Sequence, residues 1–336
     1  MSESLLGTVC AKGVLCAVSV SYWRGRKQLD PADLGLNPAE VNKNLIQLGH
    51  KHLMPRESLQ DLSLSEGRAR AILDHYSLPF MGGLARYVPY NNLDILLKEL
   101  EEQKNAFNDA KTKFLESYDT LREAALVEWR ATADSLGEKG RGLMPRVIAA
   151  YPAMCQAFRD RFSFRVRMFQ INAMDAGSDT TLLTDDNLDM LTGAMERRRA
   201  IAREAERELQ SDLQGFVRES ITLLREETSK LVGEVITSID EGKSGVHQKT
   251  LNRLTSFIER FKSLNFAGDK QLETTLAQFQ ADLLSRSAED YRNNPRSRDE
   301  LRAGLGRLRE QAMDMVRQDV STVLSGFGKM GVRNFD

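Results

Sequence analysis

Two stretches of the chain carry the hydrophobic pattern of half-buried β-strands, in which apolar residues share one face. The first is Val14 to Trp23, whose sequence VLCAVSVSYW is short and rich in β-branched and aromatic residues. In the second, residues 161–171, Phe162 and Phe164 alternate with polar and basic residues, which predicts a strand with one wet, basic face. We expect the second strand to add to the sheet that the first begins. The basic residues of the second stretch are Arg161, Arg165 and Arg167.

The rest of the first 90 residues predicts a small α/β head. Short helices are expected at Pro38 to Leu48 and at Ser65 to His75, where the Ser65 hydroxyl is placed to cap the first turn. Residues 78–83 contain a proline and two adjacent glycines, which disfavour both regular structures, so we expect a loop there. A second short strand is expected over residues 84–88.

A very long helix is predicted over residues 91–140, because neither proline nor glycine interrupts the chain for about 45 residues after a cap at Asn91 or Asn92. Apolar residues recur along it at a strict spacing of seven, which implies left-handed supercoiling against a partner helix. Lys104 and Lys111 interrupt the second seam, so an antiparallel pairing within the chain is favoured over a parallel zipper. The seam residues are Leu93, Leu100, Phe107, Phe114 and Leu121.

A second long helix is predicted over residues 184–241, and the two long helices would form one stalk. The segment between them, residues 141–180, returns the chain to the head. A C-terminal helical region is expected over residues 246–325, with Asp269 as the cap of one helix, followed by a flexible tail at 326–336. Its helices are expected at 247–264, 270–292 and 297–324. The predicted fold is thus mainly α, with a long antiparallel coiled-coil-like stalk, a helical bundle and a small α/β head.

Composition narrows the class of protein. The 336 residues include 47 Lys and Arg against 48 Asp and Glu, which gives a net charge of -1. The chain therefore lacks the overall basic excess that is typical of nucleic-acid-binding proteins. Three scattered cysteines do not make a disulfide framework and indicate a reducing, cytoplasmic location. The apolar stretch from Leu5 to Trp23 carries Lys12 and lacks a basic start, so neither a signal peptide nor a membrane span is expected.

The candidates for chemistry are weak. Cys10, Cys16, His50 and His52 lack the pair spacings of a zinc site, so buried thiols and surface imidazoles are expected instead. The glycine-rich loop at 137–142 follows a helix and lacks the phosphate-loop pattern, which predicts a helix end and not a nucleotide site. No catalytic, cofactor-binding or metal-binding residue is therefore predicted.

Several motifs together carry a resemblance to a known family. They are SYWRGRKQL at residues 21–29, LGHK at 48–51, FMGGLARYVP at 80–89 and a long helix running past Trp129. In this order they resemble the uncharacterised bacterial and mobile-element family called the thirty-one-fifty domain of unknown function. The resemblance implies protein partners, namely a MoxR-type AAA+ ATPase and a von Willebrand A-domain protein, and it brings no catalytic residues.

The sequence thus predicts a non-enzymatic helical scaffold or adaptor in a multiprotein assembly. Two alternatives stay open: a membrane-acting, pore-forming-like protein that hides an insertion element at Leu5 to Val20, and a nucleic-acid-binding protein that uses the Arg161–Arg167 face. A homo-oligomer also stays open, since a second copy of the chain could complete the heptad seam of the first long helix. The residues expected to bind a partner are Trp23, Arg24, Arg26, Lys27, Arg161, Arg165 and Arg167.

Overall fold

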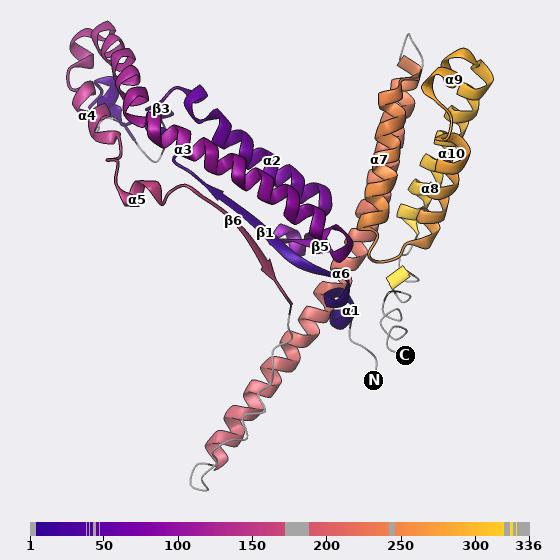
Figure 1. Cartoon of the computed structure of the whole chain (residues 1–336). Helices are drawn as coiled ribbons and strands as arrows, with labels where there is room; N and C mark the ends of the chain where they lie inside the picture. The colour runs from indigo at the N-terminus through magenta and orange to yellow at the C-terminus, as the bar shows by residue number, and fades with distance from the viewer. Residues whose placement is uncertain are drawn as a thin grey trace. The chain divides into compact units, whose positions relative to one another are not determined.

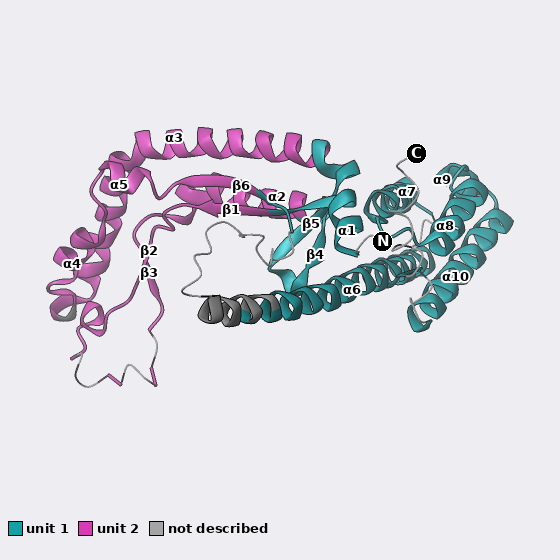
Figure 2. Ribbon diagram, turned by 90° about the horizontal axis from the view of Figure 1, so that it is seen from below, with its two compact units in different colours: residues 1–16, 74–94, 168–336 teal, residues 17–73, 95–167 magenta. Residues whose placement is uncertain are grey.

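The computed structural model describes residues 5–37, 39, 41–42, 45–46, 48–171, 188–241, 246–318, 323–324 and 327 (Figure 1). The chain is mainly α-helical with a small antiparallel sheet, as predicted. It divides into two compact units (Figure 2): unit 1 is residues 1–16, 74–94 and 168–336, and unit 2 is residues 17–73 and 95–167. Strand β1, Gly13–Ser21, and the first long helix, α3, Tyr90–Ser135, each contribute residues to both units.

The four-stranded sheet has the order β4-β5-β1-β6, so β4 and β6 are its edge strands. The first residues of β1 pair antiparallel with β5, from Gly13 opposite Pro89 to Cys16 opposite Arg86. Both strands predicted from the hydrophobic pattern are present, and the order confirms that β6 lies beside β1. The strands are β1 Gly13–Ser21, β4 Leu78–Phe80, β5 Ala85–Pro89 and β6 Ser163–Phe169.

Three local predictions for the first 90 residues are wrong. The loop at 78–83 is instead β4 followed by the 3₁₀ turn η3 Met81–Gly83, and β4 tolerates Pro79 because an edge strand can lack one N–H. The described residues between 38 and 48 form turns and bends and not a helix. Leu45 and Ile46 are exposed there, so a helix would have no buried face to stabilise it.

The third error concerns helix α2, Gln60–Tyr76, which begins five residues before the expected start at Ser65. Ser65 lies inside the helix, where its hydroxyl donates to the Asp61 carbonyl. The 3₁₀ helix η2, Arg56–Leu59, leads directly into α2 and replaces the expected cap. Before it, 3₁₀ helix η1, Pro31–Leu34, and a two-stranded ribbon of β2, Arg26–Gln28, and β3, His50–His52, complete this part of unit 2.

The first long helix, α3, spans Tyr90–Ser135, a length of 46 residues. It starts before the predicted caps, and the Asn92 amide inside its first turn donates to the Tyr76 carbonyl. After it come η4 Gly137–Gly140, α4 Leu143–Ala150 and α5 Gln156–Arg159, which leads into β6.

The predicted coiled coil is not confirmed. Of the heptad residues, Leu100, Phe107 and Phe114 are buried, while Leu93 and Leu121 are half-buried. The Phe107 ring packs against that of Phe164 in β6, with 5.9 Å between the ring centres. The Phe114 ring packs against that of Phe162, with 5.7 Å between the centres. A spacing of seven also suits a helix that lies along a sheet, since it too buries one stripe every two turns. The pattern therefore marked a buried face without identifying what covers it.

Unit 1 holds the second long helix and the C-terminal helices. Helix α6 contacts α1, α7 and α10, and its internal glycines Gly215 and Gly233 do not break it. The predicted start at 184–186 lies outside the described residues. The helices are α1 Leu5–Lys12, α6 Leu188–Glu241, α7 Gln248–Leu264, α8 Lys270–Leu283, α9 Ala288–Asn293 and α10 Pro295–Arg317.

The caps of the C-terminal helices follow the sequence closely. The Asp269 carboxylate accepts from the Leu272 N–H and begins α8, as predicted. The helix expected over 270–292 is interrupted, however, because Ser287 forms a capping box with Asp290 and starts α9. Asn294 caps α10. Of the predicted tail at 326–336, only Phe327 is described, and it is fully buried in the core of unit 1.

Candidate interaction surface

Strand β6 has two unlike faces. Phe162, just before the strand, and Phe164 are buried, whereas Arg165 and Arg167 are exposed, so the predicted period of two holds from residue 162 to 167. It ends at Met168, which is 52% exposed. Arg161 is exposed in the turn that precedes the strand. In the part of the chain that the structure describes, no acidic side chain pairs with these three arginines. The wet face of the strand leads us to expect that these arginines pair with acids of the long helices, but among the described residues no such pair is present.

An aromatic cluster in unit 2 fixes the buried face of β6. Phe158 packs edge-on against Trp23 at 5.5 Å and against Phe162 at 5.4 Å. Tyr118 packs on the rings of Trp23 and Phe158, and its hydroxyl donates to the Pro152 carbonyl at 2.8 Å. Burial raises the pKa of Tyr118 to about 12, so this hydroxyl stays a donor at neutral pH. The cluster holds the start of β6 in place against α3.

A lysine that interrupts the predicted seam reinforces this attachment. Lys111 is half-buried on α3, and its ammonium group donates to the Phe162 carbonyl at 3.2 Å. A charged donor to a carbonyl is among the stronger hydrogen bonds. Lys111 therefore has a role that a coiled-coil interpretation could not assign to it.

A groove of 790 Å³ runs between α3 and β6 within unit 2. Its walls are partly apolar, and Lys104 on one wall is paired with Glu101 at 3.0 Å. The other basic groups of the groove are Arg165 and Arg167, and among the described residues no acid pairs with either of them. The lining residues are Leu97, Leu100, Glu101, Lys104, Phe164, Arg165, Val166 and Arg167.

The basic turn after β1 is built differently. Trp23 is only 8% exposed and belongs to the aromatic cluster, so it supports the turn from the core and has little surface to offer a partner. The Arg24 guanidinium lies 4.3 Å from the centre of the Tyr22 ring and pairs with Glu66 at 2.8 Å. Arg26 and Lys27 on β2 are exposed.

A buried ion cluster that the sequence did not reveal anchors this region. The Asp33 carboxylate accepts from Lys51 at 2.5 Å and from Arg146 at 3.2 Å. Burial alone would raise the pKa of Asp33, but the hydrogen bonds from Lys51 and the Asp30 backbone, with the two positive charges, lower it below its usual value. Each carboxylate oxygen has a partner, so the cluster joins η1, β3 and α4 structurally.

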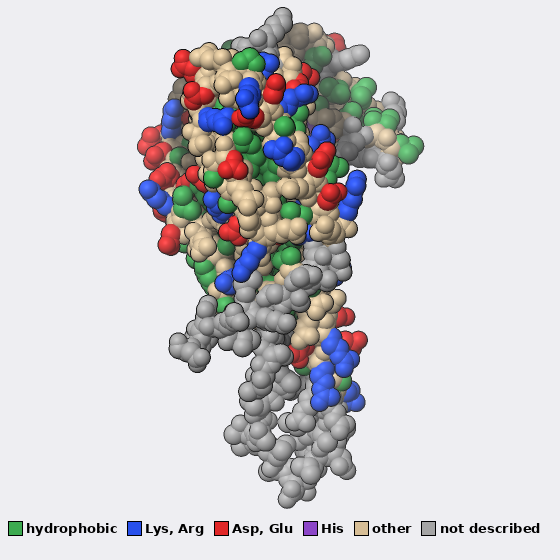
Figure 3. Space-filling view, turned by 90° about the vertical axis from the view of Figure 1, so that its right-hand side faces the viewer, with side chains coloured by type: hydrophobic (Ala, Val, Ile, Leu, Met, Phe, Trp, Pro, Cys, Tyr) green, Lys and Arg blue, Asp and Glu red, His purple; other side chains and the backbone are tan. Residues whose placement is uncertain are grey.

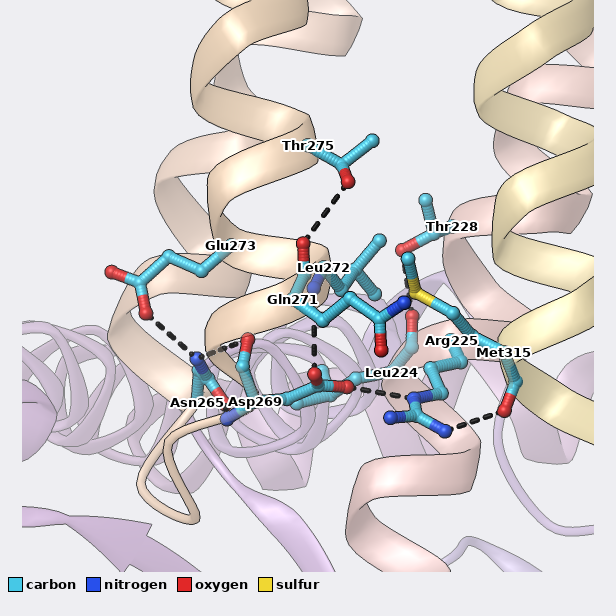
Figure 4. A network of polar contacts seen from close by, with 10 residues as sticks. All are labelled: Leu224, Arg225, Thr228, Asn265, Asp269, Gln271, Leu272, Glu273, Thr275 and Met315. Atoms are coloured by element: carbon cyan, nitrogen blue, oxygen red, sulfur yellow. Dashed lines mark hydrogen bonds and ion pairs between the residues drawn. The ribbon is translucent and has the colours of Figure 1, made fainter. Parts of the chain in front are cut away.

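A second buried ion pair lies in unit 1 (Figure 4). The Arg225 guanidinium of α6 donates to Asp269 at 2.7 Å and to the Met315 carbonyl of α10. Asp269 also caps α8. The Asn265 amide oxygen accepts from the Asp269 N–H, and its amide nitrogen donates to the Glu273 carboxylate. These contacts tie α6, α8 and α10 together, and they give the buried charges a structural explanation that needs no substrate.

The cysteine and histidine residues lie in separate surroundings. Within the described ranges there is no group of three or more His, Cys, Asp or Glu side chains placed to hold a metal ion. Cys16 is buried, which raises the pKa of its thiol to about 11, and the Cys10 thiol donates to the Ile171 carbonyl. His50 and His52 are exposed on β3.

The face of the C-terminal helices differs from that of β6 in its charge pattern. Over the face of the C-terminal helices, acidic and basic side chains are interspersed (Figure 3). Several of them pair with each other, such as Arg253 with Glu234 and Arg302 with Asp240. Among the helices that the structure describes, none has an apolar stretch of the length a bilayer requires.

A comparison with protein-family models finds one match, which covers residues 11–292 and carries the description protein of unknown function DUF3150. No curated protein and no solved structure matches the chain significantly. The family match agrees with the resemblance found in the sequence motifs, and the match extends over both long helices and β6.

Proposed function

The chain belongs to the DUF3150 family of proteins of unknown function, and we propose that it is a non-enzymatic adaptor in a multiprotein assembly. Its proposed partners are a MoxR-type AAA+ ATPase and a von Willebrand A-domain protein, as the family resemblance implies. A cytoplasmic location fits this proposal, because all three cysteines are free thiols.

The observation that carries the proposal is the basic face of β6. Exposed arginines on a sheet edge that pair with no acid among the described residues are groups that a partner can satisfy. Arginine is also among the residues enriched at protein interfaces, where its planar group binds carboxylates with two hydrogen bonds. The buried ion pairs Lys51–Asp33 in unit 2 and Arg225–Asp269 in unit 1 are, by contrast, satisfied within the fold.

A second candidate function is nucleic-acid binding through the same arginines. Single-strand binders combine basic residues with exposed aromatic rings on which bases stack. The two phenylalanines that alternate with the arginines, Phe162 and Phe164, are buried. The exposed ring of β6 is Phe169 at the end of the strand, and one ring is less than the row on which successive bases stack, which favours a protein partner. A pore-forming role stays open as a further alternative, because a hidden insertion element would also be buried, as Val9 and Cys16 of the apolar N-terminal stretch are.

Light scattering of the purified chain, alone and mixed with an ATPase and a von Willebrand A protein from its own genetic neighbourhood, tests the proposal. A larger complex whose size changes with nucleotide is expected. Assembly of the chain without either partner would indicate a structural polymer, and an inert monomer in every mixture would contradict the adaptor function. Flotation with neutral-lipid vesicles tests the membrane alternative, which predicts salt-resistant binding.

A further inference from the structure

We propose that the groove between α3 and β6 binds an extended peptide with alternating acidic and apolar residues, which adds to the sheet as a fifth strand beside β6. This inference rests on the proposed function and specifies how one partner is held.

The first argument is the position of β6 in the sheet. In the order β4-β5-β1-β6, this strand has a neighbour on one side only. The opposite edge therefore presents backbone N–H and C=O groups that an added strand would pair with. Such main-chain hydrogen bonds supply affinity for any extended peptide, and side-chain pockets decide which sequence fits.

The second argument is the unlike chemistry of the two faces. Residues of an added strand lie on the same face as the β6 residues opposite them. Peptide side chains on the outer face would meet Arg165 and Arg167, which are exposed and lack an acidic partner in the described chain. Side chains on the other face would point toward α3, from which Leu97 and Leu100 line the same groove beside Phe164 of β6. Carboxylates therefore suit one face and small apolar groups the other.

The third argument excludes a second copy of β6 as the natural occupant. Residues 161–167 carry three arginines and no acid, so two such strands placed side by side would bring like charges together. Like charges on neighbouring positions destabilise strand pairing. The arginines thus act against self-association at this edge and favour an acidic strand.

The test uses the whole chain and a fluorescein-labelled peptide of seven residues, the length of β6, in which Val and Glu alternate. Fluorescence anisotropy measures its binding. Two matched peptides separate the contributions: one with Pro in place of each Val, which keeps the charge but cannot add as a strand, and one with Lys in place of each Glu. We expect the Val-Glu peptide to bind about tenfold or more tightly than either of them.

The protein variants reverse the two charges of β6. In R165E/R167E the Val-Glu peptide should bind at least about tenfold more weakly, while the Val-Lys peptide should gain affinity. The gain shows that the variant is folded and that charge pairing sets the preference. The control is R298E/R307E, which makes the same charge change at exposed positions of α10 and should leave binding unaltered.

Four results would overturn the inference: equal binding of the Pro-containing peptide, equal binding by R165E/R167E, no binding of the Val-Glu peptide, or tighter binding of a single-stranded oligonucleotide. The last would favour the nucleic-acid alternative. Failure of this inference is distinguishable from failure of the proposed function. If R165E/R167E still assembles with the ATPase and the von Willebrand A protein, the adaptor function stands and the binding edge is wrong. If the peptide binds as expected but the wild-type chain joins no complex, the proposed function fails.

Discussion

Replacing Arg225 by methionine should strongly destabilise unit 1. The Arg225 and Asp269 side chains are each only 3% exposed, and their nitrogen and oxygen atoms lie 2.7 Å apart. Methionine approximates the length of the arginine stem but removes the charge and the donor to the Met315 carbonyl. The Asp269 carboxylate would then stay buried with the cap to Leu272 as its main remaining contact.

The size of this effect follows from the burial. Removing one partner of a buried ion pair costs about 3–5 kcal/mol, because an uncompensated charge is left inside the protein. Adding Asp269→Asn removes that charge, and the amide oxygen can still accept from the Leu272 N–H. The double variant R225M/D269N should therefore be more stable than R225M alone and lose only about 1–2 kcal/mol relative to wild type, mainly for the unpaired carbonyl and the lost hydrogen bond.

Urea unfolding followed by helix circular dichroism measures both variants and D269N, which closes a double-mutant cycle. Exposed Arg298, replaced by methionine, is the matched control and should change the midpoint little. Two results would contradict this account. One is an R225M variant as stable as wild type. The other is additive effects of R225M and D269N in the double variant, which would mean that Arg225 and Asp269 do not stabilise each other.

Three further results are expected. Phe114→Ala should lower the free energy of unfolding by about 3–5 kcal/mol and reduce the near-ultraviolet circular dichroism, because the ring is 3% exposed within the aromatic cluster. Since the pKa of Asp33 is lower in the folded state, the stability it contributes is present above its unfolded pKa of about 3.9 and is lost as the pH falls through the folded value. Lys51→Met should move that loss to higher pH, as urea midpoints between about pH 5 and pH 3 would show. A thiol reagent should modify exposed Cys155 rapidly and buried Cys16 slowly, since the pKa of the Cys16 thiol is about 11.

Each of these has an outcome that contradicts it. A wild-type near-ultraviolet spectrum in F114A would mean that the cluster does not depend on this ring. An acid transition at the same pH in K51M and wild type would show that Lys51 does not hold the Asp33 charge. A fast thiol phase that persists in the double variant Cys10→Ser/Cys155→Ser would show that buried Cys16 is accessible.

The sequence predicts best what depends on near neighbours. The alternation at Phe162 to Arg167 places β6 correctly, and its order with β1 in the sheet follows from the same pattern. The Asp269 cap is found because a helix start needs an acceptor within three residues of the free N–H groups. The first long helix is evident from its run without proline or glycine, and the second from a capping-competent start and apolar residues at steps of three and four.

What the sequence does not predict depends on contacts between distant residues. The heptad of α3 is real, but a buried stripe looks the same whether a helix or a sheet covers it. Arg146 meets Asp33 across 113 residues and Arg225 meets Asp269 across 44, and neither spacing forms a motif. The groove likewise combines residues of α3 and β6 that are far apart along the chain.

Hydrogen–deuterium exchange of the whole chain, alone and in the presence of the ATPase and the von Willebrand A protein, tests the central claim most directly. The account predicts a complex in which amide protection increases at residues 163–167 of β6 and along residues 97–104 of α3, and in which R165E/R167E loses this protection. Unchanged exchange with both partners, or protection confined to other parts of the chain, would contradict an adaptor that binds through this edge.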